Sequence, residues 1–208
     1  MEVRLFFKKI GNIRYISHLD LQRAMIRILI RSGLDITFSE GFNPHPRMAF
    51  AVPLSIYQES EYEIFDFKLN QETPFDEIKD KLSKGMPQGL DIIRVAEPKS
   101  KISSCYTARY RLTITTAKSA DEIKELLSGD ITILKKTKTK ELLCDIATQI
   151  TNRIFYEHDG KVIMEVTLPA ENNNYLNPNY IAEFLKDSID YCFIRRLCLY
   201  DINGKPME

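Results

Sequence analysis

The sequence predicts an α+β protein made of two tandem ferredoxin-like (βαββαβ) domains, the second enlarged by an insertion. Two observations predict this class. Segments of alternating apolar and polar residues, typical of half-buried strands, are interleaved with two amphipathic helical segments in each half of the chain. The order of elements is also the same in both halves, although no residue-level repeat is visible. A polar connector at 97–101 separates the predicted domains, 1–98 and 99–208.

The first half contains the order strand, helix, strand, strand, helix, strand. Its first strand is indicated by the apolar positions Val3, Leu5 and Phe7, which alternate with Arg4, Phe6 and Lys8. Ser17 to Asp20 has the form of a capping box, and Gly33 suits a helix end, so a helix is expected over 17–32. The other predicted elements are a strand at 34–38 that resumes at 48–52, a strand at 61–69, a helix at 73–84 and a strand at 90–95.

The second half follows the same order, with added residues near 137–152. A second capping box, Ser119 to Glu122, begins a helix that extends to about 127. Asn177-Pro178 begins another helix, expected to extend to about 189, and His158-Asp159-Gly160 predicts a tight turn. The predicted strands are 109–116, 130–136 with a possible hairpin return at 140–146, 153–157, 162–168 and 191–200.

Composition describes a globular protein without bulk charge. The 208 residues include 29 basic and 29 acidic side chains, which argues against a protein that coats nucleic acid by overall charge. The charge is asymmetric locally, since residues 1–50 contain eight lysines and arginines against four acidic residues. No apolar run is long enough to cross a membrane and no signal peptide is visible, so a cytoplasmic protein is expected.

The four cysteines show no metal or redox spacing. No C-x-x-C motif occurs, and Cys192 and Cys198, which share a strand face, are interpreted as small apolar residues. Two histidines without a clear third ligand do not define a metal site. Neither a metal nor a cofactor is predicted.

A cationic stripe is expected along the first helix. Arg23, Arg27 and Arg31 recur at every fourth position, beside a buried face that includes Leu21 and Met25. The plainer interpretation is a solvated side of the helix. Like charges four residues apart repel, however, and no acidic residue stands four positions away, so a ligand-facing stripe is an equal alternative.

The turn Gly41 to Arg47 is expected to be rigid. Pro44 and Pro46 fix their own φ and disfavour helix in the residues before them. Asn43, His45 and Arg47 would therefore be presented with little conformational freedom, which favours a binding role. The plainer alternative is that the prolines only end a strand.

Two further features offer contacts for RNA. The basic run 135–140 indicates either a solvated hairpin tip or a phosphate-contacting loop, through Lys136 and Lys138. Phe6, between Arg4 and Lys8, suits base stacking, but the preferred interpretation is an amphipathic strand whose Phe6 packs on the second domain.

The segments YISHLDL and GFNPHPRMAFAVPLS, within 3–53, resemble the radical-SAM-linked proteins of unknown function. The resemblance continues through the segment 135–146 and the Asn177-Pro178 helix start. In that family the domain stands alone or follows a radical SAM, cobalamin-binding protein in the same chain. The resemblance implies an association with radical SAM enzymes and with ribosomal-protein and ribonuclease genes. Because the chain lacks the C-x-x-x-C-x-x-C motif, it is not expected to be the catalytic radical SAM subunit.

Together these features predict a non-catalytic module that recognises structured RNA, tRNA or rRNA, with a radical SAM partner. One alternative is a metal-independent endoribonuclease in which Tyr15, His18 and His45 meet, since histidine can act as a general acid or base near pH 7. Another is an adaptor that docks only on the radical SAM protein. The predicted RNA contacts are Arg14, Arg23, Arg27, Arg31, Asn43, His45, Arg47, Lys136 and Lys138.

Overall fold

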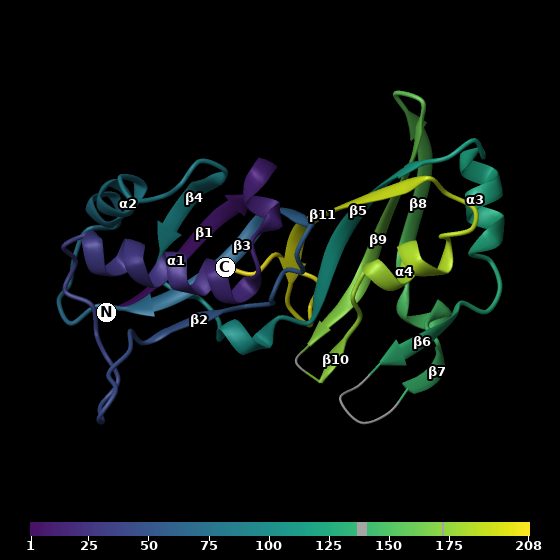
Figure 1. Cartoon of the computed structure of the whole chain (residues 1–208). Coiled ribbons are helices and arrows are strands. Elements are labelled where there is room, and N and C mark those ends of the chain that lie inside the picture. The colour runs from purple at the N-terminus through teal and green to yellow at the C-terminus, as the bar shows by residue number, and fades with distance from the viewer. Residues whose placement is uncertain (137–140, 172) are drawn as a thin grey trace. The chain divides into compact units, whose positions relative to one another are not determined.

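The computed structural model describes residues 1–136, 141–171 and 173–208. The chain divides into two compact units (Figure 1). Unit 1 comprises Met1–Cys105 and Cys198–Glu208, and unit 2 comprises Tyr106–Leu197. Each unit combines helices with mostly antiparallel strands, and the described residues include four α-helices, so the predicted α+β class is confirmed. The domain boundary at 98/99 stays a prediction, and no feature of the sequence indicated that residues 198–208 return to unit 1.

Unit 1 has the element order β1-α1-β2-β3-α2-β4, and its strands lie in the spatial order β2-β3-β1-β4. All three pairs of neighbouring strands are antiparallel. The register of β1 and β3 places Arg4 opposite Asp66. The element bounds are β1 Glu2–Lys9, α1 His18–Arg31, β2 Met48–Phe50, β3 Glu59–Lys68, α2 Phe75–Ser83 and β4 Leu90–Ala96.

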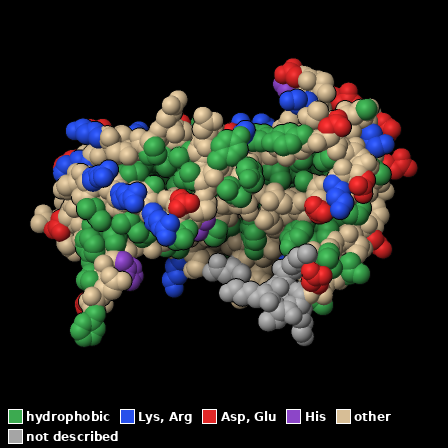
Figure 2. Space-filling view, in the orientation of Figure 1, with side chains coloured by type: hydrophobic (Ala, Val, Ile, Leu, Met, Phe, Trp, Pro, Cys, Tyr) green, Lys and Arg blue, Asp and Glu red, His purple; other side chains and the backbone are tan. Residues whose placement is uncertain are grey.

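Both helices of unit 1 cover the same face of its sheet (Figure 1). Apolar side chains of α1 and α2 join those of β1 and β3 in one buried core, and burial of this kind contributes about 25 cal/mol per Å² of apolar surface. The opposite side of α1 is exposed, and Figure 2 shows lysine and arginine side chains gathered over it. The helix residues in the core are Leu21, Met25, Ile28, Leu29, Ile78 and Leu82.

The predicted ends of α1 are confirmed. The Ser17 hydroxyl accepts a hydrogen bond of 3.1 Å from the Asp20 backbone N–H, which satisfies one of the free donors of the first turn. Ser32 is the C-cap, and Gly33 takes a φ of 70° just after it. The capping residues therefore fix both ends of the helix that carries Arg23, Arg27 and Arg31.

The strand predicted at 34–38 is wrong. This segment forms only isolated bridges, from Ile36 to Leu69 and from Phe38 to Pro46. Because Pro46 has no N–H, it cannot extend the ladder beside Phe38. The strand that was expected to resume at 48–52 is limited to the three residues of β2.

The second face of the unit 1 sheet is closed by the unit's own residues. Phe6 is fully buried, with the Arg94 Cζ 3.9 Å from its ring centroid and the Tyr62 ring 5.4 Å away. The Tyr62 hydroxyl donates to the Met207 carbonyl at 2.8 Å, so residues near the end of the chain lie against this face. The interpretation of Phe6 as a base-stacking residue is therefore wrong.

Unit 2 has the element order β5-α3-β6-β7-β8-β9-β10-α4-β11. Its strands lie in the order β10-β9-β5-β11, and β8 also pairs with β9, while β6 and β7 form a separate hairpin. The bounds are β5 Thr107–Thr115, α3 Ala120–Leu126, β6 Thr132–Lys136, β7 Glu141–Asp145, β8 Thr151–His158, β9 Lys161–Glu171, β10 Asn174–Tyr175, α4 Asn179–Phe184 and β11 Tyr191–Tyr200.

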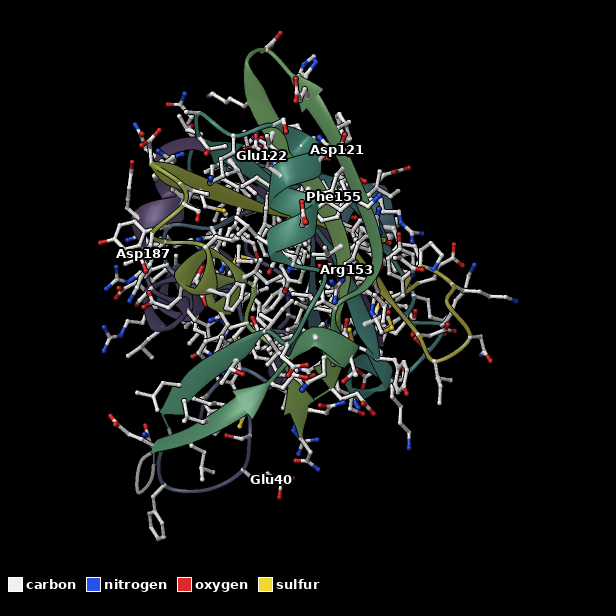
Figure 3. All side chains as sticks on the ribbon, turned by 90° about the vertical axis from the view of Figure 1, so that its right-hand side faces the viewer. Glu40, Asp121, Glu122, Arg153, Phe155 and Asp187 are labelled. Carbon is white, nitrogen blue, oxygen red and sulfur yellow. The ribbon has the colours of Figure 1, made fainter. Side chains whose placement is uncertain are left out.

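The two faces of the unit 2 sheet differ in character. Even-numbered residues of β5, among them Tyr110 and Leu112, are fully buried, whereas odd-numbered residues are half-buried. On the helix-covered side, Arg153 and Phe155 of β8 lie beside α3 (Figure 3), and Arg153 donates to the Leu127 carbonyl at 2.5 Å. The predicted capping box of α3 is confirmed, since Ser119 and Glu122 satisfy each other's backbone N–H.

Helix α4 is shorter than the predicted 177–189. Pro178 is its N-cap, and the Asn177 side chain accepts from the Asn179 N–H at 3.0 Å, as the Asn-Pro start indicated. The helix ends at Phe184 because the following residues turn back, and the Asp190 N–H bonds to the Thr115 carbonyl at 2.8 Å. That bond fixes the chain at the end of β5 before β11 begins.

Cys105 is buried, and Cys144, Cys192 and Cys198 are half-buried. All four are free, and burial raises the pKa of the Cys192 thiol to about 12, so it stays protonated near neutral pH.

In the part of the chain that is described, no helix combines the length and apolar composition needed to cross a membrane.

Because of Glu165, the stability of unit 2 is expected to depend on pH in the acid range. Burial opposes the charged form, but hydrogen bonds from Arg111 at 2.8 and 2.9 Å and from Arg109 at 3.2 Å outweigh it and lower the pKa of Glu165 below 4.5. A lowered folded-state pKa stabilises the fold above the unfolded pKa, and this contribution is lost as the pH falls through the folded value. We expect the stability of unit 2, measured by hydrogen exchange of β5 and β9 amides, to fall below pH 4.5. A smaller loss in Glu165→Gln would support the assignment, and an unchanged pH profile would contradict it.

Candidate nucleic-acid interface

The three arginines of α1 lie on its exposed side. A helix rises about 1.5 Å per residue, so successive members of the row are about 6 Å apart along the axis. Arg23 forms a 3.2 Å ion pair with Asp20, three residues earlier, so its charge is partly compensated although no acidic residue stands four positions away. Arg31 lies in the last turn, where a cation interacts favourably with the helix dipole. Among the described residues, Arg27 and Arg31 form no ion pair.

Apolar side chains accompany the arginines on this side of α1. Leu19 and Ile30 lie near the two ends of the helix, in a row with Arg23 and Arg27. Their side chains are 53% and 57% exposed. The face is therefore basic and apolar together, a character that suits contacts with bases or with a protein as well as with phosphates.

The segment that contains Gly41 to Arg47 forms a projecting loop with an ordered stem. The Ser39 N–H donates to the His45 carbonyl at 2.8 Å, the His45 N–H donates to the Ser39 hydroxyl at 3.1 Å, and that hydroxyl lies 3.0 Å from His45 Nδ1. The Arg47 N–H donates to the Thr37 carbonyl at 2.9 Å. The stem therefore orients His45 through three bonds to one serine.

Phe42 stands at the tip of this loop and is completely exposed, with a relative accessibility of 113%. Gly41, before it, has a φ of 125°, a backbone conformation that a side chain would oppose. Figure 2 shows hydrophobic atoms at the place where this loop projects from the surface. Phe42 is not among the contacts predicted from the sequence. The sequence feature that could have indicated Phe42 is a large apolar residue between Gly41 and Asn43, at a place where polar turn residues are expected.

The residues proposed for nuclease chemistry contact different partners. His18 Nε2 lies 3.1 Å from the Gln22 amide nitrogen, and its ring packs edge-on against Phe50 at 5.1 Å. Tyr15 packs against Tyr57 at 5.8 Å. His45 is five residues before Phe50, which is about 16 Å of extended chain at about 3.3 Å per residue. No described contact joins Tyr15, His18 and His45, so the endonuclease alternative gains no support from geometry.

Arg14 is held within unit 1 rather than presented like the α1 arginines. Its guanidinium donates to the Tyr15 hydroxyl at 2.7 Å and lies 3.7 Å from a Glu59 carboxylate oxygen. Glu59 is buried and also accepts from the Gly11 N–H at 2.8 Å.

The predicted contacts Lys136 and Lys138 remain predictions, because Lys138 and the Lys136 side chain lie outside the described residues.

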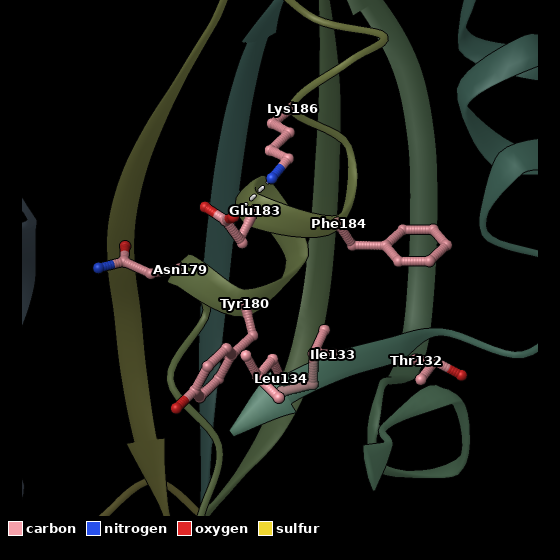
Figure 4. A pocket seen from close by; sticks show the side chains of 8 residues that line it. All are labelled: Thr132, Ile133, Leu134, Asn179, Tyr180, Glu183, Phe184 and Lys186. Atoms are coloured by element: carbon pink, nitrogen blue, oxygen red, sulfur yellow. Dashed lines mark hydrogen bonds and ion pairs between the residues drawn. The ribbon is translucent and has the colours of Figure 1, made fainter. Parts of the chain in front are cut away.

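Unit 2 contains a hollow of about 760 Å³ between β6 and α4 (Figure 4). Its charged groups cancel, since Lys186 pairs with Glu183 at 3.1 Å, so it offers no surplus charge to a phosphate. Within the described ranges, no group of three His, Cys, Asp or Glu side chains could hold a metal ion. The hollow is lined by Thr132, Ile133, Leu134, Asn179, Tyr180, Glu183, Phe184 and Lys186.

Comparison with solved structures supports the fold alone. The chain is similar to a chain of "Crystal Structure of a Cbf5-Nop10-Gar1 Complex", with a TM-score of 0.55 and 10% identity over 95% of this chain and 48% of that one. This chain thus spans about half the length of that relative. The small subunit of acetolactate synthase from Thermotoga maritima matches 93% of this chain and 91% of its own, with 9% identity and a TM-score of 0.25, which is too low for an argument.

Sequence comparison gives a family but no curated relative. No curated protein matches the chain significantly. Residues 2–178 match the model of a family described as "Uncharacterized protein conserved in bacteria (DUF2344)". Because this match covers well over half of the 208 residues, the protein belongs to that family.

Proposed function

We propose that this protein recognises structured RNA, such as tRNA or rRNA, through unit 1 without catalysing a reaction itself. The observation that carries the proposal is the row of exposed arginines on α1, in which Arg27 and Arg31 form no ion pair with a described residue. The chain as a whole is neutral, so cations left in line on one helix are a local feature rather than a result of bulk charge. Contact with phosphates would release counterions and so favour binding.

The projecting loop would supply contacts that phosphates alone do not give. Asn43, His45 and Arg47 are exposed on it, and Phe42 presents an aromatic ring at its tip. Unpaired bases in RNA loops and bulges are commonly bound by stacking on aromatic rings and by hydrogen bonds to their edges. The ordered stem lowers the conformational entropy that the loop would lose on binding.

We also propose that both units are ferredoxin-like. The β-α-β-β-α-β order of unit 1 and its strand order β2-β3-β1-β4 support this assignment. In unit 2 the corresponding strands lie in the order β8-β9-β5-β11, and the β6–β7 hairpin accounts for the predicted insertion. The proposed domains 1–98 and 99–208 follow this repetition of element order.

The proposed partner is a radical SAM enzyme, in the cytoplasm. The support for it is the resemblance of YISHLDL and GFNPHPRMAFAVPLS to radical-SAM-linked proteins. A second candidate function, a protein-only adaptor, is favoured by one observation: Leu19 and Ile30 are exposed beside the arginines of α1. Apolar anchors with arginine are common at the centres of protein interfaces.

Replacing Arg27 by glutamate is expected to weaken RNA binding at least tenfold, because it exchanges an attraction to phosphate for a repulsion. The measurement is a gel-shift titration against total small cellular RNA at low and physiological salt. The slope of log K against log salt should become shallower by about one in the variant. Lys101→Glu is the matched control, since Lys101 is an exposed cation of unit 1 that does not lie on α1.

The same titration separates the alternatives. An equal loss in Lys101→Glu would mean that bulk charge rather than α1 determines binding. The absence of any shift at low salt would reject RNA recognition and leave the protein adaptor. RNA fragments on a denaturing gel that disappear with His45→Ala would instead support the endonuclease.

A further inference from the structure

The outer faces of the two sheets, opposite their helices, differ in accessibility. In unit 1, Arg4 and Phe6 on this face are fully buried, and Arg4 donates to the main-chain carbonyls of Ser100 and Glu208 at 2.9 and 2.6 Å. In unit 2, the outer residues of β5, β8 and β11 are half-buried or exposed, while on β9 Lys161 is exposed and Ile163 is buried. The sheet face opposite the helices is therefore accessible to a ligand in unit 2 but not in unit 1.

Strand register brings polar and aromatic side chains together on the outer face of unit 2. Thr113 of β5 stands opposite Ile163 of β9, which stands opposite Tyr156 of β8. His158 pairs with Lys161 at the end of the same two strands. Because side chains in a strand alternate between faces, these residues lie opposite the buried core positions of β5.

These residues line a hollow of about 280 Å³, to which β11 contributes Phe193 and Arg195. Its lining holds three cations, Arg111, Lys161 and Arg195, against the single carboxylate of Asp159. Glu165 lies beside the hollow, but Arg109 and Arg111 both bond to it, so its charge is already compensated. Cations therefore outnumber carboxylates among the residues that line the hollow.

Two aromatic rings accompany these cations. Tyr156 is 39% exposed, and its hydroxyl lies 3.5 Å from Glu165. The Arg195 Cζ lies 5.6 Å from the centroid of the Phe193 ring. Aromatic rings set among cations form the surfaces on which single-stranded nucleic acids stack their bases, since stacking is tolerant of sequence and the cations follow the backbone.

We propose that this hollow binds one nucleotide of an unpaired RNA segment, with its base on Tyr156 or Phe193 and its phosphate near Lys161 and Arg195. The volume is just below the roughly 300–1,000 Å³ of pockets for drug-sized ligands, which fits a single nucleotide better than a larger molecule. The inference rests on the proposed function only for the choice of RNA as the polymer, since every residue that forms the hollow belongs to unit 2.

A unique fluorescent reporter can test the proposal, because the chain contains no tryptophan. In Tyr156→Trp, an unstructured octamer of uridylate should quench the new fluorescence as its base stacks. Uridine monophosphate should compete weakly, whereas inorganic phosphate and polyglutamate at equal charge should not. Displacement of the octamer by phosphate alone would reveal a simple anion site, and equal displacement by polyglutamate would indicate an acidic protein partner. Either result would overturn the nucleotide assignment.

Substitutions in the otherwise native chain provide the second measurement, by fluorescence anisotropy of a labelled octamer. Tyr156→Ala should weaken binding about tenfold, within the roughly 1–3 kcal/mol that stacking on one base contributes. Tyr156→Phe should retain binding within about twofold, because it keeps the ring. Tyr106→Ala is the matched control, since Tyr106 is also 39% exposed but does not line the hollow. Thermal melting of each variant checks that the fold is intact.

These outcomes separate this inference from the proposed function. Octamer binding that is unaffected by Tyr156→Ala but lost in Arg27→Glu would overturn the unit 2 site and leave recognition through α1 standing. Loss in Tyr156→Ala with no effect of Arg27→Glu would support the hollow and contradict the α1 assignment. Equal losses in Tyr156→Ala and Tyr106→Ala would overturn the inference.

Discussion

Replacing Arg4 by alanine is expected to lower the free energy of unfolding of unit 1 by about 4 kcal/mol, since removal of one partner of a buried ion pair typically costs 3–5 kcal/mol. The Arg4 side chain is fully buried, and two of its nitrogens each bond to an Asp66 carboxylate oxygen at 2.7 Å. It also holds the carbonyls of Ser100 and Glu208. Alanine would leave Asp66, which is only 16% exposed, and both carbonyls without this donor.

The matched control for Arg4 is the neighbouring cross-strand pair. Glu2 and Lys68 stand opposite each other in the same two strands and form a 3.3 Å ion pair, but their side chains are 61% and 40% exposed. Glu2→Ala is therefore expected to cost under about 1 kcal/mol. Hydrogen exchange of β1 and β3 amides, measured with urea unfolding, reports on unit 1 specifically. Equal effects of the two substitutions would show that Arg4 has no special role in closing the outer face.

Gly89→Ala is expected to destabilise unit 1 by about 3 kcal/mol, through backbone strain and steric overlap together. Gly89 has a φ of 90°, and a Cβ placed there would lie 2.3 Å from the Ile10 carbonyl oxygen and 3.2 Å from the Ile13 side chain. The Ile10 oxygen belongs to the backbone, and the Ile10 N–H donates to the Gly89 carbonyl at 2.9 Å. Relief of the overlap would therefore strain or break the bond that joins these two loops.

Gly33→Ala separates the two causes. Gly33 also has a positive φ, 70°, but a Cβ there would have no atom within 4 Å. This variant should show only the cost of the left-handed conformation, about 1 kcal/mol. The measurement is urea unfolding followed by circular dichroism, with the same hydrogen exchange for unit 1. A Gly89→Ala variant no less stable than Gly33→Ala would contradict the overlap argument.

The closure of the outer face also explains why two similar sheets are proposed to have different roles. In β1, the alternation of Arg4, Phe6 and Lys8 suited base stacking as well as packing, but Arg4 and Phe6 are fully buried, and Arg4 bonds to main-chain oxygens of unit 1. In β5, Arg109, Arg111 and Thr113 alternate in the same way. No binding role was predicted for them from the sequence, yet they lie on the accessible face. A strand pattern shows which residues share a face and says nothing about what covers it.

Elements with local signals could be predicted from the sequence. The capping residues Ser17 and Ser119 begin helices where expected, and Gly160 takes part in the predicted hairpin turn with a φ of 67°. These signals depend on hydrogen bonds and φ preferences within a few residues, so they hold without tertiary information. The prediction failed at 34–38, where Pro46 has no N–H for a ladder bond, and after Phe184, where the chain forms turns instead of further helix.

By itself, the sequence determined the α+β class, the β-α-β-β-α-β order of the first half and the α1 arginine row. Each of these follows from periodicity or from the chemistry of adjacent residues. Only the tertiary structure decided that Arg14 lies beside Glu59, that Phe42 is fully exposed and that Tyr15, His18 and His45 contact different partners. It also decided that Phe6 is buried while Tyr156 is accessible. The physical reason is that exposure and pairing depend on side chains brought together from distant parts of the chain, which no local pattern encodes.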